Sequence, residues 1–229
     1  MGGKVIVAID GPSGAGKSTV GKMLALELGY LYIDTGAMYR ALGWKAVKEG
    51  VELKEGPQLR ELCARTDVTL RQVGGELRVY VDSQDVSPFI RTPEMSMAAS
   101  AISAQPSVRA RLLELQREMG RGGGVVLEGR DIGTVVFPEA RAKFYLDADP
   151  VQRAGRRYAE LKARGEDVSL ERIIEEVKKR DYDDSHRAIA PLKKAEDAVV
   201  IDSSRMTVEE VVGFMKGRIK EVTVGSGSK

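Results

Sequence analysis

Residues 11–18 read Gly-Pro-Ser-Gly-Ala-Gly-Lys-Ser, which matches the complete phosphate-loop pattern G-x-x-x-x-G-K-[ST]. The loop follows the apolar run 5–9, which reads as a buried strand, and leads into a segment with helical periodicity. Glycine-rich backbone followed by a helix N-terminus is an anion-binding arrangement. The sequence therefore predicts a nucleoside triphosphate site formed by Gly11, Pro12, Ser13, Gly14, Ala15, Gly16, Lys17, Ser18 and Thr19.

Two side chains of this loop have expected roles in the chemistry. Lys17 can reach the β- and γ-phosphates, and the Ser18 hydroxyl can ligate Mg²⁺. Glu128 follows another apolar run and could hold Mg²⁺ through water, or it could be a strand-end carboxylate that only accepts a hydrogen bond. ATP and Mg²⁺ are thus the expected cofactors.

Composition restricts the class of protein. The chain has 229 residues, of which 42% are hydrophobic and 31% charged, with a formal net charge of +2. These values are typical of one globular α/β domain with small inserts, and they do not favour a nucleic-acid polymer as partner. No apolar run approaches the ~20 residues of a membrane span, and we expect neither a signal peptide nor a membrane partner. With Cys63 as the single cysteine, we expect a cytoplasmic protein.

Short apolar runs predict a parallel sheet. Five of them, at 5–9, 30–33, 125–127, 142–146 and 198–201, are flanked by helical patterns, as βαβ units require. About ninety residues separate the second and third runs, more than one crossover helix needs. Within them, alternating runs at 67–70 and 76–81 predict a hairpin, and a long helix is expected from about 93 to 119. We interpret this stretch as an inserted subdomain.

Arginines and carboxylates follow the expected strands. Arg40 comes shortly after the second strand and Arg130 shortly after the third, so both are expected near the phosphate loop, where ligands sit in open α/β sheets. The alternative is a pair of surface arginines. The chain lacks both an Asn-Lys-x-Asp tetrapeptide and an Asp-x-x-Gly at a strand end, which disfavours a switch-type GTPase.

A helix expected from Ser169 to about Arg187 places charge on its inward side. Asp184 continues the apolar stripe of this helix, between Arg180 and Arg187. Burying charge without partners is costly, so a bound anion accounts for the pattern better than a surface ladder of ion pairs. Upstream, Arg153, Arg156 and Arg157 could form a flap that neutralises a phosphoryl group in transfer, or a solvated helix face.

Together these motifs resemble the bacterial cytidylate kinases, which are nucleoside monophosphate kinases. The resemblance runs from residue 9 to residue 203. It rests on the motifs at 9–17, 34–40 and 128–133, on Val108-Arg109 with Gln116-Arg117, and on the segment 180–187. It implies a three-layer phosphate-loop NTPase fold with a five-stranded parallel sheet, an inserted monophosphate-binding subdomain and a short lid. The expected parts are a core at 1–36, 120–149 and 188–229, a subdomain at about 37–119 and a lid at about 150–187.

The resemblance also implies roles for residues. Arg40, Arg130, Arg180 and Arg187 would hold the monophosphate; Thr35, Arg109 and Asp131 would read the base; Ser100 and Asp184, with Arg180, would contact the ribose; and Tyr39 belongs to the same substrate-binding set. The expected catalytic residues are Lys17, Arg130, Arg153, Arg157, Arg180 and Arg187.

Donor and acceptor chemistry predicts the choice of base. A carboxylate such as Asp131 only accepts hydrogen bonds and a guanidinium such as Arg109 only donates them. That pair matches the N4 amino group and the N3 and O2 acceptors of cytosine, whereas uracil leaves mismatched groups.

The expected reaction transfers the γ-phosphoryl group of MgATP to CMP or dCMP, by a protein that is a monomer. Two alternatives remain: a kinase for another small acceptor such as UMP, AMP or shikimate, and a nucleotide-dependent binding switch.

Overall fold

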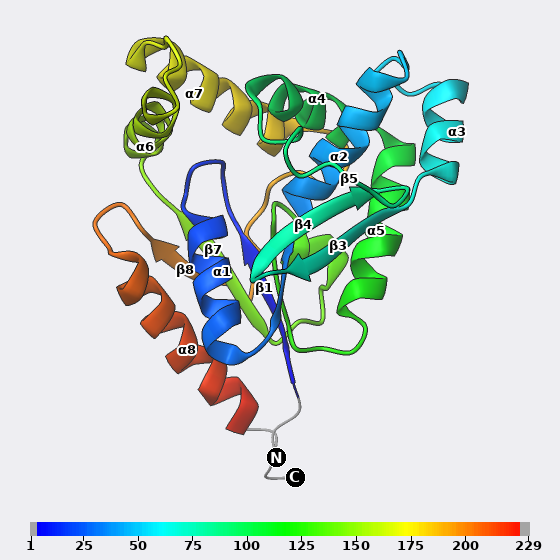
Figure 1. The fold of residues 1–229 in the computed structure, drawn as a ribbon. Helices are drawn as coiled ribbons and strands as arrows, with labels where there is room; N and C mark the ends of the chain where they lie inside the picture. The colour runs from blue at the N-terminus through cyan, green and yellow to red at the C-terminus, as the bar shows by residue number, and fades with distance from the viewer. Residues whose placement is uncertain (1–3, 225–229) are drawn as a thin grey trace. The chain divides into compact units, whose positions relative to one another are not determined.

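Strand β1 (Ile6–Asp10) lies at the centre of a five-stranded sheet with the order β2-β6-β1-β7-β8. Its neighbours are β6 (Val125–Gly129) and β7 (Ala142–Asp147), both parallel to it. The outer strands are β2 (Leu31–Asp34) and β8 (Val199–Asp202). All five predicted strands are therefore present, and the predicted α/β class with a five-stranded parallel sheet is confirmed (Figure 1).

The structure is a computed structural model that describes residues 4–224, so the predicted outer boundaries at 1 and 229 lie outside the described residues. The chain divides into two compact units. Unit 1 contains the residues up to 32 and those from 122 onwards, and unit 2 contains residues 33–121. The division into core, monophosphate-binding subdomain and lid stays a prediction.

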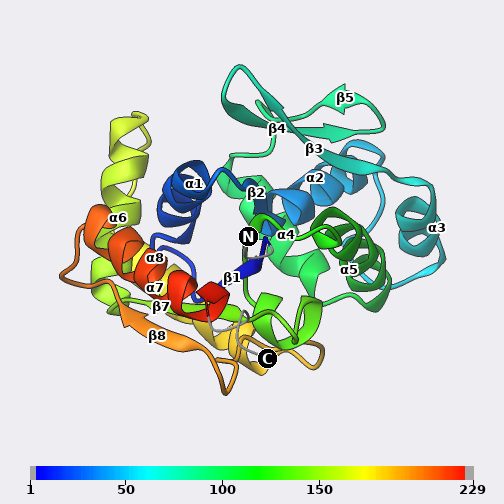
Figure 2. The same cartoon turned by 90° about the horizontal axis from the view of Figure 1, so that it is seen from below.

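Two helices of unit 1 cover one face of the sheet. Helix α1 (Lys17–Leu28) contacts β1 and β6, and α8 (Val208–Val224) contacts both β7 and α1 (Figure 2). Four apolar side chains of α8 at helical spacing are buried: Val211, Val212, Met215 and Ile219. Helical spacing of these apolar side chains thus provides one layer against the strands.

Helices α6 (Pro150–Ala163) and α7 (Leu170–His186) form a pair with a small apolar core of their own. Ala154 and Leu161 of α6 pack with Ile173 and Val177 of α7. Helix α7 begins where the sequence predicts, since the Ser169 side chain accepts a hydrogen bond from the Arg172 N–H at 3.3 Å. A short π-helical turn, η1 (Ile132–Val136), follows β6.

Unit 2 combines four helices with a three-stranded antiparallel sheet. The helices are α2 (Thr35–Lys48), α3 (Pro57–Arg65), α4 (Pro93–Ser103) and α5 (Pro106–Gly120), and the strands are β3 (Val68–Val73), β4 (Glu76–Val81) and β5 (Gln84–Asp85). The predicted hairpin is confirmed, because β3 and β4 pair across Gly74 and Gly75, whose φ angles of 60° and 82° suit a two-residue turn. Helix α3 and strand β5 were not predicted.

The single helix predicted over about 93–119 is wrong. The chain forms α4 and α5 instead, separated at Ala104 and Gln105. Pro106 has no backbone N–H and disfavours a helical residue before it, and Gln105 accordingly has φ −88° and ψ 130°. Pro106 then occupies the start of α5, where its missing N–H costs nothing.

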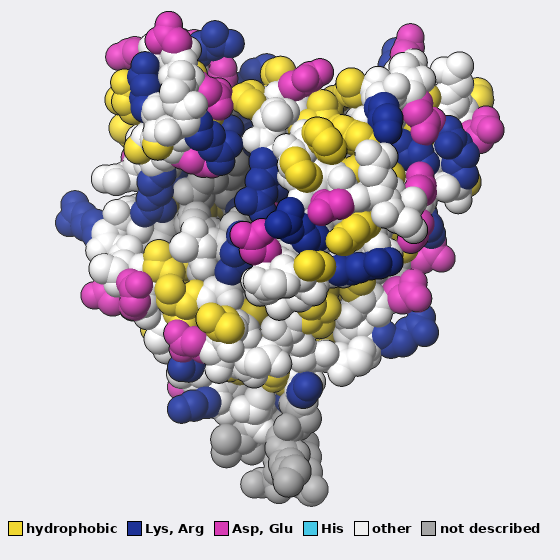
Figure 3. Space-filling view, viewed as in Figure 1, with side chains coloured by type: hydrophobic (Ala, Val, Ile, Leu, Met, Phe, Trp, Pro, Cys, Tyr) yellow, Lys and Arg dark blue, Asp and Glu magenta, His cyan; other side chains and the backbone are white. Residues whose placement is uncertain are grey.

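Charges of both signs are mixed on the face seen in Figure 3, in keeping with the near-balanced net charge. Among the helices of residues 4–224, none has the length and apolar character to cross a bilayer.

We expect Gly11→Ala to destabilise unit 1 strongly. Gly11 has φ 145°, and a Cβ atom there would lie 2.0 Å from the Leu146 carbonyl oxygen of β7. The loss in free energy of unfolding should exceed ~3 kcal/mol. Gly29→Ala is the matched control, since Gly29 has φ 64° but open space around it, and should cost only ~1 kcal/mol. Chemical denaturation of both variants measures the difference; equal losses would contradict the steric explanation.

Candidate active site

The phosphate loop joins β1 to α1, as the sequence predicts. Gly11, Gly14 and Gly16 have φ angles of 145°, 79° and 91°, and α1 starts directly after Gly16. These conformations favour glycine and allow successive backbone N–H groups to line a concave turn. The N-terminus of α1 adds its positive dipole end, and Ser18 is exposed there. The arrangement can hold an anion.

Lys17 is buried beside this loop, where its Nζ donates a hydrogen bond of 2.6 Å to the Pro12 carbonyl oxygen. Burial lowers the pKa of Lys17 to about 7, and the positive charge of Arg130 acts in the same direction. The carboxylates of Glu128 and Asp10 oppose the shift without cancelling it. Because a phosphate would favour the ammonium form, Lys17 is poised to gain charge when an anion binds.

Two buried carboxylates stand where β1 and β6 end. Glu128 lies opposite Ile9 in the β1–β6 register, and the Tyr32 hydroxyl donates a hydrogen bond to its Oε1. Asp10 accepts from the backbone N–H groups of the turn that follows β6. Burial raises the pKa of Asp10 to about 6. Sequence reasoning assigned Glu128 but gave no role to Asp10, although an acidic residue ending an apolar strand directly before a phosphate loop was a usable signal.

A group of arginines and acids joins the turn after β6 to the end of α7. Arg130 Nε donates to Asp184 Oδ2 at 2.7 Å, and Arg187 Nη2 lies 3.8 Å from Asp131 Oδ1. Burial raises the pKa of Asp184, but the neighbouring guanidinium of Arg130, followed by those of Arg180 and Arg187, outweighs it and leaves the pKa below its usual range. Asp184 is buried, as its place in the apolar stripe predicted.

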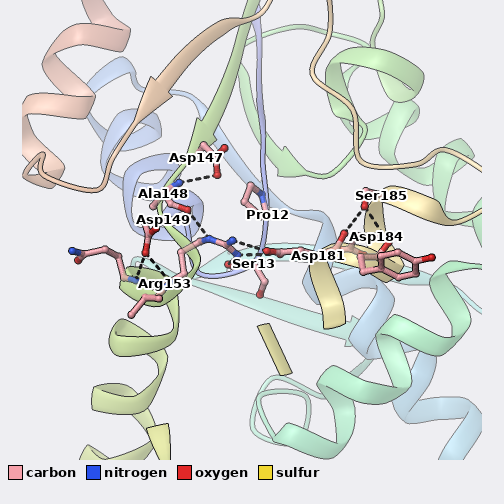
Figure 4. A network of polar contacts seen from close by, with 12 residues as sticks. Pro12, Ser13, Asp147, Ala148, Asp149, Arg153, Asp181, Asp184 and Ser185 are labelled. Atoms are coloured by element: carbon pink, nitrogen blue, oxygen red, sulfur yellow. Dashed lines mark hydrogen bonds and ion pairs between the residues drawn. The ribbon is translucent and has the colours of Figure 1, made fainter. Parts of the chain in front are cut away.

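The buried Arg153 connects three segments of unit 1 (Figure 4). Its guanidinium donates to both carboxylate oxygens of Asp181 on α7, at 3.0 and 2.5 Å, and to the Ser13 carbonyl oxygen of the phosphate loop at 3.0 Å. Its Nε donates to the Ala148 carbonyl oxygen at 2.8 Å. Arg153 thus links α6, α7 and the loop. Asp181 was missed by sequence reasoning, since nothing in a single helix pattern identifies a partner twenty-eight residues away.

The other two arginines of α6 have partners different from those of Arg153. Arg156 Nη2 donates to the Ser203 carbonyl oxygen at 2.8 Å, and the Ser203 hydroxyl donates to the Ala15 carbonyl oxygen of the phosphate loop at 3.0 Å. Arg157 pairs with Glu160 on its own helix at 2.9 Å. In this conformation the structure brings Arg153 and Arg156, but not Arg157, into the hydrogen-bond network around the loop.

The remaining residues that the sequence predicts for substrate binding lie in unit 2. Asp34 begins α2 by accepting from the Ala37 N–H at 2.8 Å, and its other oxygen binds Arg40 Nη2 at 3.0 Å. Arg40 Nε is buried and has no hydrogen-bond partner among the described residues. Such an atom is a candidate donor to a bound anion.

Three more predicted residues of unit 2 are placed by their own helices. Thr35 is the first residue of α2 and is buried. Arg109 on α5 is buried, and its Nη1 donates to the Ser103 carbonyl oxygen at 3.1 Å. Its Cζ atom lies 5.9 Å from the ring centroid of Tyr39. Ser100 lies on α4. Arg109 and Tyr39 are thus neighbours, although α5 and α2 are far apart in sequence.

The site combines a phosphate loop with a buried lysine and with guanidinium groups near that lysine. These features define the class of the protein as a phosphate-loop phosphotransferase. A model of the family described as Cytidylate kinase matches residues 7–221, and the chain belongs to the cytidylate kinase family. The family resemblance seen in the sequence is therefore confirmed.

Individual relatives match over nearly their whole length. The chain is 53% identical over 217 residues to "Cytidylate kinase" of Geobacter sp. (strain M21), which covers 95% of this chain and 93% of the relative. It is 52% identical over 214 residues to "Cytidylate kinase" of Pelotomaculum thermopropionicum, covering 93% and 95%. The crystal structure of an uncharacterized protein from Eubacterium ventriosum ATCC 27560 shares the fold, with a TM-score of 0.52, 11% identity and coverage of 95% and 99%.

We expect binding of MgADP to be accompanied by proton uptake of up to about one proton at pH ~8. Lys17, with a pKa of about 7, is largely neutral at that pH, and bound phosphates would favour its charged form. Titration calorimetry in two buffers with different ionisation enthalpies measures the uptake. Lys17→Arg keeps a permanent charge and should abolish it. Equal uptake by that variant would assign the proton to another group.

Proposed function

We propose that the protein transfers the γ-phosphoryl group of MgATP to CMP or dCMP, giving ADP and CDP or dCDP. The observation that carries this proposal is the cluster of guanidinium groups around Asp184, on the same unit as the phosphate loop. A protein that only hydrolyses or senses ATP needs one phosphate site, whereas a monophosphate acceptor brings a second dianionic group. Membership of the cytidylate kinase family supports the same choice.

The proposed chemistry needs positioning and charge neutralisation rather than a general base. A phosphate oxygen of CMP is already anionic near neutral pH and attacks the γ-phosphorus in line, while the bond to the ADP leaving oxygen breaks. Lys17 stabilises charge on the β- and γ-phosphates. Arg130, Arg180 and Arg187 neutralise the acceptor phosphate, and Arg40 binds it as well.

MgATP would be held by residues 11–19, whose backbone N–H groups would donate to its phosphates. Mg²⁺ usually takes one or two protein groups besides phosphate oxygens and water, and the exposed Ser18 hydroxyl and the buried Glu128 carboxylate, through water, meet that need. Bound Mg²⁺ would neutralise negative charge on the phosphates of ATP. Arg153 and Arg157 are proposed to contact the transferred phosphoryl group, for which Arg153 would exchange its present partners.

Side chains at the positions of the family motifs would read the nucleoside of CMP. We assign the base to Thr35, Arg109 and Asp131, and the ribose to Ser100 and Asp184 with Arg180; Tyr39 lies beside Arg109 and completes the set. Asp131 would accept from the cytosine amino group and Arg109 would donate to its acceptors. The protein is proposed to act as a cytoplasmic monomer on small nucleotides.

The experiment that tests this function is ADP release from MgATP with a panel of ribo- and deoxyribonucleoside monophosphates. CMP and dCMP should support rapid release, and UMP should be a much poorer acceptor. Slow release that no acceptor stimulates would favour a nucleotide-dependent switch, and preference for UMP, AMP or shikimate would favour another kinase.

We expect Asp131→Ala to reduce the ratio of kcat/KM for CMP over UMP by about 10–100-fold, the value of one hydrogen bond to a charged group. Asp183→Ala is the matched control, because Asp183 is an exposed acid on α7 that pairs with Lys179. An unchanged ratio in Asp131→Ala would remove Asp131 from base recognition without removing the phosphotransferase activity.

A further inference from the structure

The carboxylate of Asp10 binds the turn that follows the neighbouring strand. Asp10 is the last residue of β1 and directly precedes the phosphate loop, yet its side chain reaches the start of η1. Oδ1 accepts from the Ile132 N–H at 2.8 Å and Oδ2 accepts from the Gly133 N–H at 2.7 Å. The side chain therefore holds two consecutive backbone groups of the neighbouring turn.

Two bonds from one carboxylate to consecutive N–H groups fix the orientation of the turn as well as its position. One bond would leave the turn able to rotate about it, whereas two bonds remove that freedom. Bonds to an ionised acceptor are also short and strong. Asp10 is only 4% exposed, so water does not compete effectively for these oxygens.

The packing leaves little tolerance at this contact. A Cβ atom at Gly133 would lie 3.4 Å from Asp10 Oδ2 and 3.1 Å from Lys143 Cδ on β7. The absence of a side chain at position 133 therefore keeps the turn clear of the Lys143 side chain while its N–H binds Asp10. A larger residue there would have to displace the turn or the Lys143 side chain, while leaving the carboxylate in place.

The turn held in this way carries two residues of the proposed CMP site. Arg130 and Asp131 directly precede Ile132, and Arg130 in turn binds Asp184 at 2.7 Å. A shift of the Ile132 and Gly133 N–H groups would move both side chains, and a displacement of about 1 Å in a positioning group can cost ~10²-fold in rate.

We propose that Asp10 is a positioning residue for the monophosphate substrate, which acts by holding the N–H groups of Ile132 and Gly133 so that Arg130 and Asp131 are correctly placed. The proposal rests on the proposed function, because it takes Arg130 and Asp131 as CMP contacts. Asp10 adjoins the phosphate loop in sequence, so a general defect of the loop would instead weaken the binding of MgATP. The KM values for CMP and for MgATP therefore distinguish a role in positioning the CMP site from a defect of the loop.

The test begins with Asp10→Asn, which keeps one acceptor oxygen but turns an amide N–H₂ towards the other backbone N–H. We expect KM for CMP to rise about tenfold or more, KM for MgATP to change by less than about twofold, and the CMP-over-UMP ratio of kcat/KM to fall. Equal rises in both KM values, or no change in either, would overturn the proposal.

Gly133→Ala provides a second variant that leaves Asp10 intact. It should change the same parameters in the same direction, and it keeps the proposal falsifiable if Asp10→Asn does not fold. Asp85→Asn is the matched control, since Asp85 also accepts from a backbone N–H, that of Ser87 at 2.9 Å, but lies in the three-stranded sheet of unit 2. It should leave both KM values unchanged, and thermal unfolding of all three variants monitors the fold.

A double variant decides whether Asp10 acts through the turn. If it does, Asp10→Asn should reduce the CMP-over-UMP ratio much less in an Asp131→Ala background than in the wild type. Fully additive effects would reject this route. The wild-type protein is assayed first, since absence of CMP-dependent ADP release would reject the proposed function, whereas normal wild-type activity with unaffected variants would reject only the role of Asp10.

Discussion

The close approach of Gly11 to β7 is the constraint on which the phosphate site depends. Strand β1 lies between β6 and β7, and the chain leaves it where a Cβ atom would lie 2.0 Å from the Leu146 carbonyl oxygen. Only glycine fits there, at φ 145°. Because the loop can turn so tightly, the last residue of β1 and the first residue of α1 lie close enough for Asp10 to influence the pKa of Lys17. The central strand, the loop and the helix are thus closely joined at Gly11.

Positive charge around this element is balanced by carboxylates of the same chain. Asp184 binds Arg130, and Asp181 binds Arg153. Without such partners the guanidinium groups would repel one another and would be costly to bury. Lys17 Nζ instead donates to a backbone carbonyl oxygen, and burial lowers the pKa of Lys17 to about 7. The site therefore tolerates its cations when no nucleotide is bound, and anionic substrates can take over part of the role of the carboxylates.

Sequence patterns predicted the features that depend on neighbouring residues and missed the contacts between residues far apart in the sequence. The phosphate loop, the five strands, the hairpin and the start of α7 follow from short-range periodicity and turn chemistry, and all were predicted. The break at Pro106 was local too, but the prediction of a single helix over about 93–119 overlooked it. The links from Asp10 to Gly133 and from Arg153 to Asp181 join positions far apart in sequence, so no periodicity reveals them. The positions proposed for CMP came from family motifs rather than from spacing.

Two buried acids near the site, Asp184 and Asp10, have different kinds of partner, and the difference bears on how a kinase can be selective. Asp184 has its pKa held below the usual range by guanidinium groups that overcome the effect of burial, whereas burial raises the pKa of Asp10 to about 6 despite two backbone hydrogen bonds. A carboxylate that faces guanidinium groups can respond when an anion enters among them. One that binds backbone N–H groups has partners that are not themselves proposed to bind the substrate. The first kind is suited to contact a substrate, and the second to hold in place the residues that do.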